Sequence, residues 1–299
     1  MEISVIVPCY NEEASIKEFC NMMKDGFEKR KIKYELIFID DGSTDDTFKL
    51  LKEEEKGNKS IKLISFSKNF GKEAAMYAGL SYASGKYISI MDADMQHTFD
   101  MLISMFDKLK EDETYDIVCS YKSSRVDEKP LKRVLTSTFY KLNNKVSDVK
   151  LLPGASDFRI FKSCVKDAIL SITEKDRFLK GIFSWIGYNT IYVPYTPEKR
   201  LHGNSKWSLL KLIQYSLNGF ISFNDLPLRF FFFSGIIIFI ISLLNFILIG
   251  KLGVRTLILL ISYLILMIGV ISLYLSKIYN NSLNRPIYII KEKVGFDRK

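Results

Sequence analysis

Two carboxylates, Asp92 and Asp94, follow the apolar run 87–91, and Gln96 comes two residues later. A run of this length predicts a buried strand, so the acidic pair is expected at its carboxyl end, where ligands bind in open α/β sheets. Two hard oxygen ligands plus an amide carbonyl suit Mg²⁺ or Mn²⁺, which keeps open positions for a substrate's phosphates. The alternative is an ordinary acidic turn, because Asp-x-Asp also occurs by chance.

The elements that would position this pair follow a regular alternation. From residue 1 to about 120, short apolar segments alternate with stretches whose apolar residues recur at helical spacing, which predicts a parallel α/β sheet. The basic, polar stretch 121–155 that follows is typical of a solvated loop and helix. Strands are expected at 3–7, 35–39, 62–66, 87–91 and 116–120, and helices near 13–29, 45–56, 72–83 and 99–110.

The composition narrows the choice of partners. The chain has 299 residues and a formal net charge of +9, which favours an anionic partner such as a lipid head group or a nucleotide. No nucleic-acid recognition motif or clustered basic stripe appears, so nucleic acid is excluded. The beginning of the chain is too short and too acidic for a secretory signal and is predicted to be the first strand of a cytosolic domain. The four cysteines lack metal or redox spacing and are interpreted as small buried hydrophobes in a reducing compartment: Cys9, Cys20, Cys119 and Cys164.

The last third of the chain is strongly apolar. Segments 226–250 and 256–276 are each long enough to cross a bilayer, and basic residues concentrate outside the pair. The positive-inside rule therefore places both termini and the α/β domain in the cytoplasm, as at a bacterial plasma membrane. Segment 207–223 has the spacing of an amphipathic helix at the membrane surface, or of a helix buried against the α/β domain. The expected divisions are a catalytic domain at 1–205, an interfacial helix at 206–226, two spans at 227–280 and a cytosolic tail at 281–299.

Several segments together resemble family 2 glycosyltransferases of the GT-A fold, specifically the polyprenyl-phosphate glycosyltransferases. This group includes dolichol-phosphate mannosyltransferases and bactoprenol glucosyltransferases. Any one segment is a weak signal, but all of them occur in the family's order over nearly the whole chain. The matching segments are 5–13, 40–45, 69–72, 92–97, 156–159 and 200–207, followed by the two spans.

The resemblance implies a role for each candidate residue. A mostly parallel sheet flanked by helices would bind a nucleotide sugar, and a divalent cation would be bound by Asp92, Asp94 and Gln96. Asp157 would be the catalytic carboxylate together with Asp94, or it would orient the acceptor or hold Arg159. His97 is interpreted as a surface imidazole at a helix start, and Lys68 as a solvated neighbour. The nucleotide-sugar residues would be Pro8, Tyr10, Asn11, Glu12, Asp40, Asp41, Lys72 and Asp92, and the acceptor phosphate would contact Arg125, Arg133, Arg200 and Lys206.

The predicted reaction is the inverting transfer of a hexose, glucose from UDP-glucose, onto a polyprenyl phosphate such as undecaprenyl phosphate. The same reaction with UDP-N-acetylglucosamine, or with GDP-mannose and dolichyl phosphate, is an alternative. A second alternative is an inactive membrane-anchored protein that binds nucleotide sugars. A processive polysaccharide synthase is disfavoured, because its Gln-x-x-Arg-Trp motif is absent from the sequence. Contacts between the spans of neighbouring copies, as in a homo-oligomer, are typical of the resembled enzymes.

Overall fold

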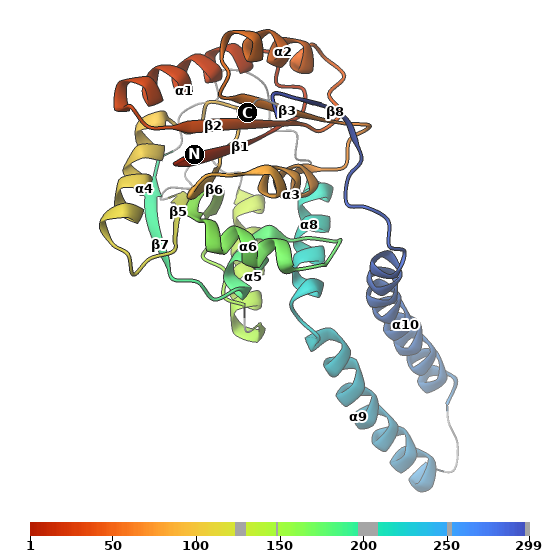
Figure 1. Ribbon diagram of the computed structural model, residues 1–299. Coiled ribbons are helices and arrows are strands. Elements are labelled where there is room, and N and C mark those ends of the chain that lie inside the picture. Colours follow the sequence, from red (N-terminus) through yellow and green to blue (C-terminus); the bar gives the residue numbers. More distant parts are fainter. Residues whose placement is uncertain (123–129, 148, 197–208, 250–252, 297–299) are drawn as a thin grey trace.

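The computed structural model describes residues 1–122, 130–147, 149–196, 209–249 and 253–296, and its arrangement is shown in Figure 1. Within these ranges the strands form one mixed sheet in the order β7-β5-β6-β4-β1-β2-β3-β8. The strands are β1 (Ile3–Cys9), β2 (Tyr34–Asp40), β3 (Ile61–Phe66), β4 (Tyr87–Ile90), β5 (Ile117–Lys122), β6 (Ala155–Lys162), β7 (Thr190–Tyr195) and β8 (Ile290–Val294).

The direction of the strands decides which residues meet. The central strands β4, β1, β2 and β3 run parallel, so their carboxyl ends lie at one edge of the sheet. Strand β6 runs antiparallel to β4, with Arg159 opposite Ile90. The beginning of β6 therefore lies beside the end of β4. Asp157, the third residue of β6, is thereby placed at the same edge as Asp92 and Asp94.

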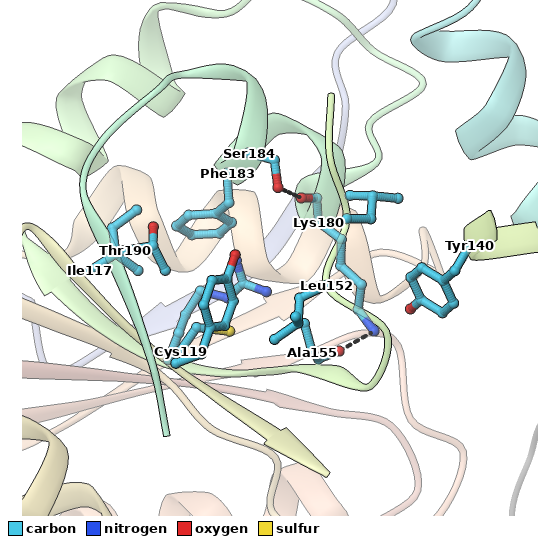
Figure 2. A pocket seen from close by; sticks show the side chains of 12 residues that line it. Ile117, Cys119, Tyr140, Leu152, Ala155, Lys180, Phe183, Ser184 and Thr190 are labelled. Atoms are coloured by element: carbon cyan, nitrogen blue, oxygen red, sulfur yellow. Dashed lines mark hydrogen bonds between the residues drawn. The ribbon is translucent and has the colours of Figure 1, made fainter. Parts of the chain in front are cut away.

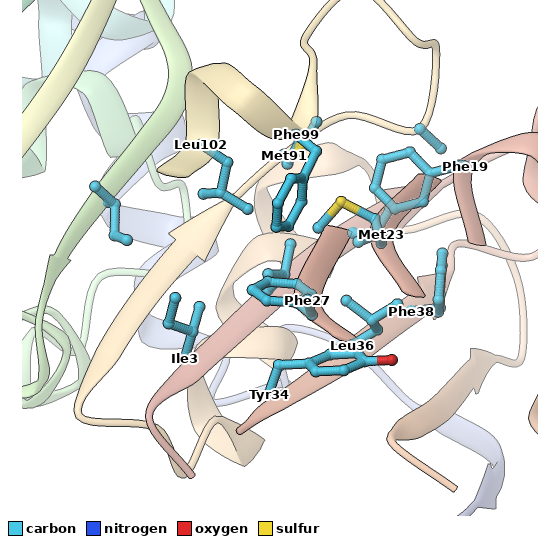
Figure 3. Packing of buried hydrophobic residues seen from close by; sticks show 14 of the residues in the cluster. Ile3, Phe19, Met23, Phe27, Tyr34, Leu36, Phe38, Met91, Phe99 and Leu102 are labelled. Atoms are coloured by element: carbon cyan, nitrogen blue, oxygen red, sulfur yellow. The ribbon is translucent and has the colours of Figure 1, made fainter. Parts of the chain in front are cut away.

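Helices cover both faces of the sheet and bury its apolar side chains. The cluster drawn in Figure 3 packs α1 and α4 against β1 and β2, with Phe27 stacked on Tyr34 at a ring separation of 4.3 Å. On the opposite face, α3 packs against β1 and β2, α6 packs against β4 and β6, and α7 contacts β6 through Phe183 and Phe161. The helices are α1 (Ile16–Arg30), α2 (Thr47–Gly57), α3 (Lys72–Tyr82), α4 (Phe99–Glu111), α5 (Pro130–Val146), α6 (Ser163–Ser171), α7 (Leu179–Trp185), α8 (Leu209–Ser222), α9 (Leu226–Ile249) and α10 (Val254–Ser282).

Helices α9 and α10 extend away from the sheet as a pair (Figure 1). Both are long and apolar enough to cross a membrane, and the most apolar stretch of each has no side chains buried in the protein. They contact each other through Tyr263, whose hydroxyl lies 2.7 Å from Ser234 Oγ and donates to the carbonyl of Phe231.

The predicted strands and helices are present, with ends shifted by a few residues. The main difference lies after the second apolar helix, in the segment expected to be a cytosolic tail. This segment returns to the sheet as β8 and pairs antiparallel with β3, so that it covers an edge that would otherwise be open. A smaller correction concerns the cysteines, because Cys164 is exposed whereas the other three are buried.

Candidate active site

The loops after β1 and β2 hold each other in place at the carboxyl edge of the sheet. The backbone N–H of Asn11 donates to Ser43 Oγ at 3.0 Å, and Asn11 Oδ1 accepts the N–H of Thr44 at 2.8 Å. The N–H of Glu12 donates to Thr47 Oγ1 at 2.8 Å. Asn11 adopts a positive φ of 53°, which an asparagine tolerates better than most residues. The predicted nucleotide segment is therefore a fixed turn.

Asp40 and Asp41 have different surroundings although they are neighbours. Asp40 accepts the N–H of Ser43 and the hydroxyl of Ser65, so it supports the turn. Asp41 accepts the N–H groups of Phe70 and Gly71 at 2.6 and 2.9 Å. Burial raises the pKa of Asp41 to about 6, because it outweighs the stabilising effect of these two hydrogen bonds.

Gly42 lets the chain turn directly after this pair. Its φ is +66°, and a Cβ at this position would lie 2.5 Å from the carbonyl carbon of Lys68. A larger residue would therefore push the loop before α3 away from the loop after β2. The close approach of the two loops is what brings the N–H groups before α3 within reach of the Asp41 carboxylate.

The ammonium group of Lys72, at the start of α3, lies between two of the predicted carboxylates. Its Nζ is 2.7 Å from Asp92 Oδ1 and 2.9 Å from Asp157 Oδ2. Burial alone would lower the pKa of Lys72, but the charges of Asp157 and Asp92 outweigh it and raise the pKa. The chain thus joins residues from α3, β4 and β6 in one charged cluster, which we call the Lys72 cluster (Lys72, Asp92 and Asp157).

Two further cations lie near Asp157. Lys180, from α7, places Nζ 3.6 Å from Asp157 Oδ1. The same Nζ donates to the carbonyl of Ala155, a bond drawn in Figure 2. Burial would raise the pKa of Asp157, but Lys180, Lys72 and Arg159 together hold it well below its usual range. Asp157 is therefore a carboxylate at any physiological pH, and a very weak base.

Lys180 is not predicted by the sequence, and Arg159 is predicted only as a residue held by Asp157. Arg159 is buried, donates to the carbonyl of Ser156 and stacks over the ring of Phe183, with its Cζ 4.0 Å from the ring centre. The residues around Lys180 in the sequence do not indicate that it lies near Asp157, because α7 reaches Asp157 only through the tertiary packing of the chain. Arg159, two residues beyond Asp157 on a strand, could have been inferred from its shared face.

Asp94 and Gln96 lie on the turn that follows β4. Met95 between them has a φ of 60°, and the N–H of Gln96 donates to Asp94 Oδ1 at 3.2 Å. The carboxylates of Asp92 and Asp94 and the amide of Gln96 are oxygen donors of the type that Mg²⁺ or Mn²⁺ prefers. Lys72 already neutralises Asp92, however, and no group of three or more His, Cys, Asp or Glu side chains in the described ranges could hold a metal ion. The chemical type of these oxygen donors therefore fits a hard divalent cation. A metal site that includes the carboxylates of both Asp92 and Asp94 requires the ammonium of Lys72 to leave Asp92.

His97 was predicted to be a surface imidazole, but the structure buries it. It is 5% exposed, and its ring stacks on Phe158 at 4.4 Å and tilts against Tyr195 at 4.8 Å. Burial lowers the pKa of His97 to about 4, although the charge of Asp92 acts in the opposite direction. His97 is therefore a neutral packing residue beneath the Asp92–Gln96 turn.

The structure thus brings together Asp92, Asp157 and Lys72, and places the Asp41 turn at the same edge of the sheet. Tyr10 lies exposed at the end of β1, and Pro8 lies within that strand. The predicted acceptor residues Arg125, Arg200 and Lys206 fall outside the described residues. Arg133 lies in α5, and its side chain is not described. The roles of all these residues stay predictions.

Comparison with known proteins agrees with this geometry. Residues 4–166 match the glycosyl transferase family 2 domain. A bactoprenol glucosyl transferase of Shigella phage SfV is 34% identical over 98% of this chain and 99% of that protein. An uncharacterised glycosyltransferase of Synechocystis is also 34% identical, over 99% of this chain and 97% of that protein.

Among solved structures, a glucosyl-3-phosphoglycerate synthase from Mycobacterium tuberculosis, in complex with Mn²⁺, UDP-glucose and phosphoglyceric acid, gives a TM-score of 0.50. It is 19% identical, and the match covers 74% of this chain and 77% of that one. A mannosyl-3-phosphoglycerate synthase from Rubrobacter xylanophilus gives a TM-score of 0.51 at 15% identity, over 73% of this chain and 71% of that one. At this level of identity the likeness shows a shared fold.

Proposed function

Because the chain belongs to glycosyl transferase family 2, we propose that it moves one hexose from a nucleotide sugar onto a polyprenyl phosphate at a membrane. The proposed donor is UDP-glucose and the proposed acceptor is undecaprenyl phosphate. The observation that carries the proposal is the Lys72 cluster, which joins Asp92, Asp157 and Lys72 at the ligand edge of the sheet.

The relatives support the choice of lipid and sugar. Full-length relatives at 34% identity are named for glucose transfer to bactoprenol. UDP-glucose is bound in the mycobacterial synthase that shares the fold. In this chain, Asp41 and the turn after β1 would receive the nucleotide, because their backbone and carboxylate groups are fixed at the sheet edge. The Asp41 carboxylate would accept a hydrogen bond from a uracil N–H or a ribose hydroxyl.

In the proposed reaction, an oxygen of the lipid phosphate attacks the anomeric carbon of the sugar. The new carbon–oxygen bond forms as the bond to the nucleoside diphosphate breaks, and the diphosphate leaves with the electron pair. A lipid phosphate is already largely anionic near neutral pH, so no strong base is needed. The low pKa of Asp157 agrees with this, because a carboxylate paired with Lys72 and Lys180 is unsuited to remove a proton. Asp157 would instead hold these two ammonium groups in place for the phosphates.

Asp94 and Gln96, with Asp92, would bind Mg²⁺ or Mn²⁺ when the nucleotide is present. A bound divalent cation would supply electrostatic stabilisation for the charge that develops on the leaving diphosphate. Lys72 would release Asp92 as the nucleotide arrives, and its ammonium would then lie close to the phosphates.

Helices α9 and α10 would span the membrane, with the sheet and both termini in the cytoplasm. Such an arrangement brings a lipid phosphate to the sheet edge without removing the isoprenoid chain from the bilayer. The division into a catalytic domain, an interfacial helix and two spans follows from this topology. Arg125, Arg133, Arg200 and Lys206 remain the proposed contacts to the acceptor phosphate.

A donor screen tests the proposal. Purified protein in detergent is incubated with undecaprenyl phosphate and with UDP-glucose, UDP-N-acetylglucosamine or GDP-mannose, and the lipid extract is analysed by mass spectrometry. The expected product is undecaprenyl phosphate heavier by one hexose, formed from UDP-glucose. The matched control replaces the acceptor with undecaprenol, which lacks the phosphate and should remain unmodified. Absence of a glycosylated lipid with every donor would contradict the proposal.

A further inference from the structure

A pocket lies where the catalytic domain meets the ends of α8 and α10. Its volume is about 430 Å³, which is the size of a small-molecule site and far larger than a single phosphate. One wall carries Lys175 and Arg177 from the loop between α6 and α7. The other wall carries Asn218 from α8 and Arg285, which follows α10. None of the residues of the Lys72 cluster lines it.

The walls of this pocket are tied together by hydrogen bonds. The backbone N–H of Lys175 donates to Asn281 Oδ1 at 3.1 Å, which fixes the α6–α7 loop to the end of α10. Arg177 is buried and donates to the carbonyls of Ile169, Ile172 and Glu174. The pocket is therefore built before any ligand arrives.

Charge in the pocket is incompletely balanced. Lys175 Nζ is buried and has no hydrogen-bond partner among the described residues. The two acidic side chains of the lining have other partners, since Glu73 accepts the N–H of Leu179 and Asp176 accepts from Asn280. A buried ammonium without a partner costs free energy, so an anion that bonds to it would be stabilised.

The position of the pocket identifies the class of anion. Asn280 lies at the end of α10 that adjoins the catalytic domain, and Arg285 follows that end. The lining also contains apolar side chains such as Phe178 and Leu283. If α9 and α10 cross the bilayer, as the proposed function holds, this end of α10 lies at the depth of the lipid head groups. Basic residues at that depth attract anionic head groups.

From these observations we propose that the pocket binds the phosphate head group of a membrane lipid, with Lys175 and Arg285 as its charged contacts. The lipid would lie outside the reacting centre. Its effect would be to steady the α6–α7 loop, and through the Glu73–Leu179 bond the beginning of α7, which carries Lys180 to Asp157. Arg177 and Asn218 would complete the lining.

Lipid retention tests this proposal without any nucleotide sugar. The purified protein is mixed in detergent with phosphatidylglycerol, phosphatidylcholine, undecaprenyl phosphate or inorganic phosphate, and bound copies are counted by native mass spectrometry. The Lys175→Ala/Arg285→Ala variant is compared with Lys59→Ala/Lys291→Ala, which removes two exposed lysines outside the pocket. With about 1 kcal/mol per basic residue, the pocket variant should bind the lipid about 10- to 30-fold more weakly than the wild type and the control.

Each outcome has a distinct meaning. Weakened retention of phosphatidylglycerol in the pocket variant supports the proposal. Weakened retention of undecaprenyl phosphate alone would overturn it, because that lipid is the proposed acceptor and the pocket would then belong to the reacting centre. Equal retention of every lipid by the pocket variant and the control would overturn the proposal, as would tight binding of inorganic phosphate without preference for a lipid. Thermal unfolding in each detergent mixture shows whether the pocket variant is folded, and Lys175→Gln serves as a milder replacement. No sugar is transferred in the lipid-retention assay. Its result therefore stands even if the donor screen finds no glycosylated lipid.

Discussion

Replacing Lys72 with methionine removes the ammonium of the Lys72 cluster but keeps most of the side-chain volume. Nζ lies 2.7 and 2.9 Å from carboxylate oxygens of Asp92 and Asp157, and these three side chains are between 23% and 34% exposed. Removing one partner of a fully buried pair costs about 3–5 kcal/mol, whereas an exposed pair contributes at most about 1 kcal/mol. For this partly screened cluster, the free energy of unfolding should fall by about 2 kcal/mol.

The variant should also respond differently to acid. The pKa of Asp157 is held below its usual range, so the stability it contributes is present above about pH 4 and is lost as pH falls through the folded-state pKa. Without Lys72 this pKa rises, although Lys180 and Arg159 still lower it, and the loss of stability begins at a higher pH. At neutral pH, transfer should slow by on the order of 10², as when one electrostatic contact is removed from an active site.

Urea unfolding of the detergent-solubilised protein at pH 7 and pH 4 measures these effects. A double-mutant cycle with Asp157→Asn should give a coupling energy of about 1–2 kcal/mol. Lys68→Met is the matched control, because Lys68 is an exposed lysine of the loop just before α3, and it should unfold like the wild type. The stabilising role of Lys72 would be refuted if Lys72→Met and Lys68→Met had the same free energy of unfolding at pH 7 and lost the same amount of it between pH 7 and pH 4.

Three further predictions follow from the site. Chelation by EDTA should abolish sugar transfer, and added Mn²⁺ or Mg²⁺ should restore it. The Asp94→Asn variant should stay inactive at any metal concentration. Full activity of the wild type in EDTA would contradict the assignment of Asp92, Asp94 and Gln96 as metal ligands. The pKa of His97 is lowered to about 4 in the folded protein, so below pH 6.5 the unfolded chain binds a proton that the folded chain does not. The free energy of unfolding should therefore fall by about 1.4 kcal/mol per pH unit between pH 6.5 and pH 4. His97→Phe should remove that slope in a urea series, and an unchanged slope would show that His97 does not cause it. Gly42→Ala should lose about 1–3 kcal/mol and bind UDP more weakly, because its φ is +66° and its Cβ would overlap backbone. Gly57→Ala, where a Cβ meets nothing within 4 Å, is the control in calorimetry, and similar losses in both variants would argue against a specific role for the Gly42 turn.

The sequence predicted much of this fold because apolar periodicity marks strands and helices wherever one face is buried. It placed Asp92 and Asp94 correctly after β4, since a short apolar run followed by acidic residues marks a strand end. It missed β7 and β8, the two outermost strands of the sheet. Strand β8, Ile290–Val294, contains three charged residues. An edge strand of this kind has one side exposed and therefore lacks the apolar run that marks a central strand.

The site was harder to predict than the fold. The contact between Lys72 and Asp157 joins residues 85 positions apart, and nothing in the local sequence of either indicates it. Lys180 reaches the cluster only because α7 packs beside β6. His97 was misplaced because a histidine before a helix resembles a surface residue, whereas its burial depends on Phe158 and Tyr195 from two other strands. Tertiary neighbours of this kind follow from the strand order, which periodicity does not specify.

Transfer of radiolabelled glucose from UDP-glucose into a lipid extract tests the central claim most directly. The wild-type protein with undecaprenyl phosphate should label the lipid, and both Asp94→Asn and Asp157→Asn, shown to be folded by thermal unfolding, should label it at least about 100-fold more slowly. Equal labelling by the wild type and the two variants would contradict the claim that the reaction depends on Asp94 and Asp157 at the edge of the sheet.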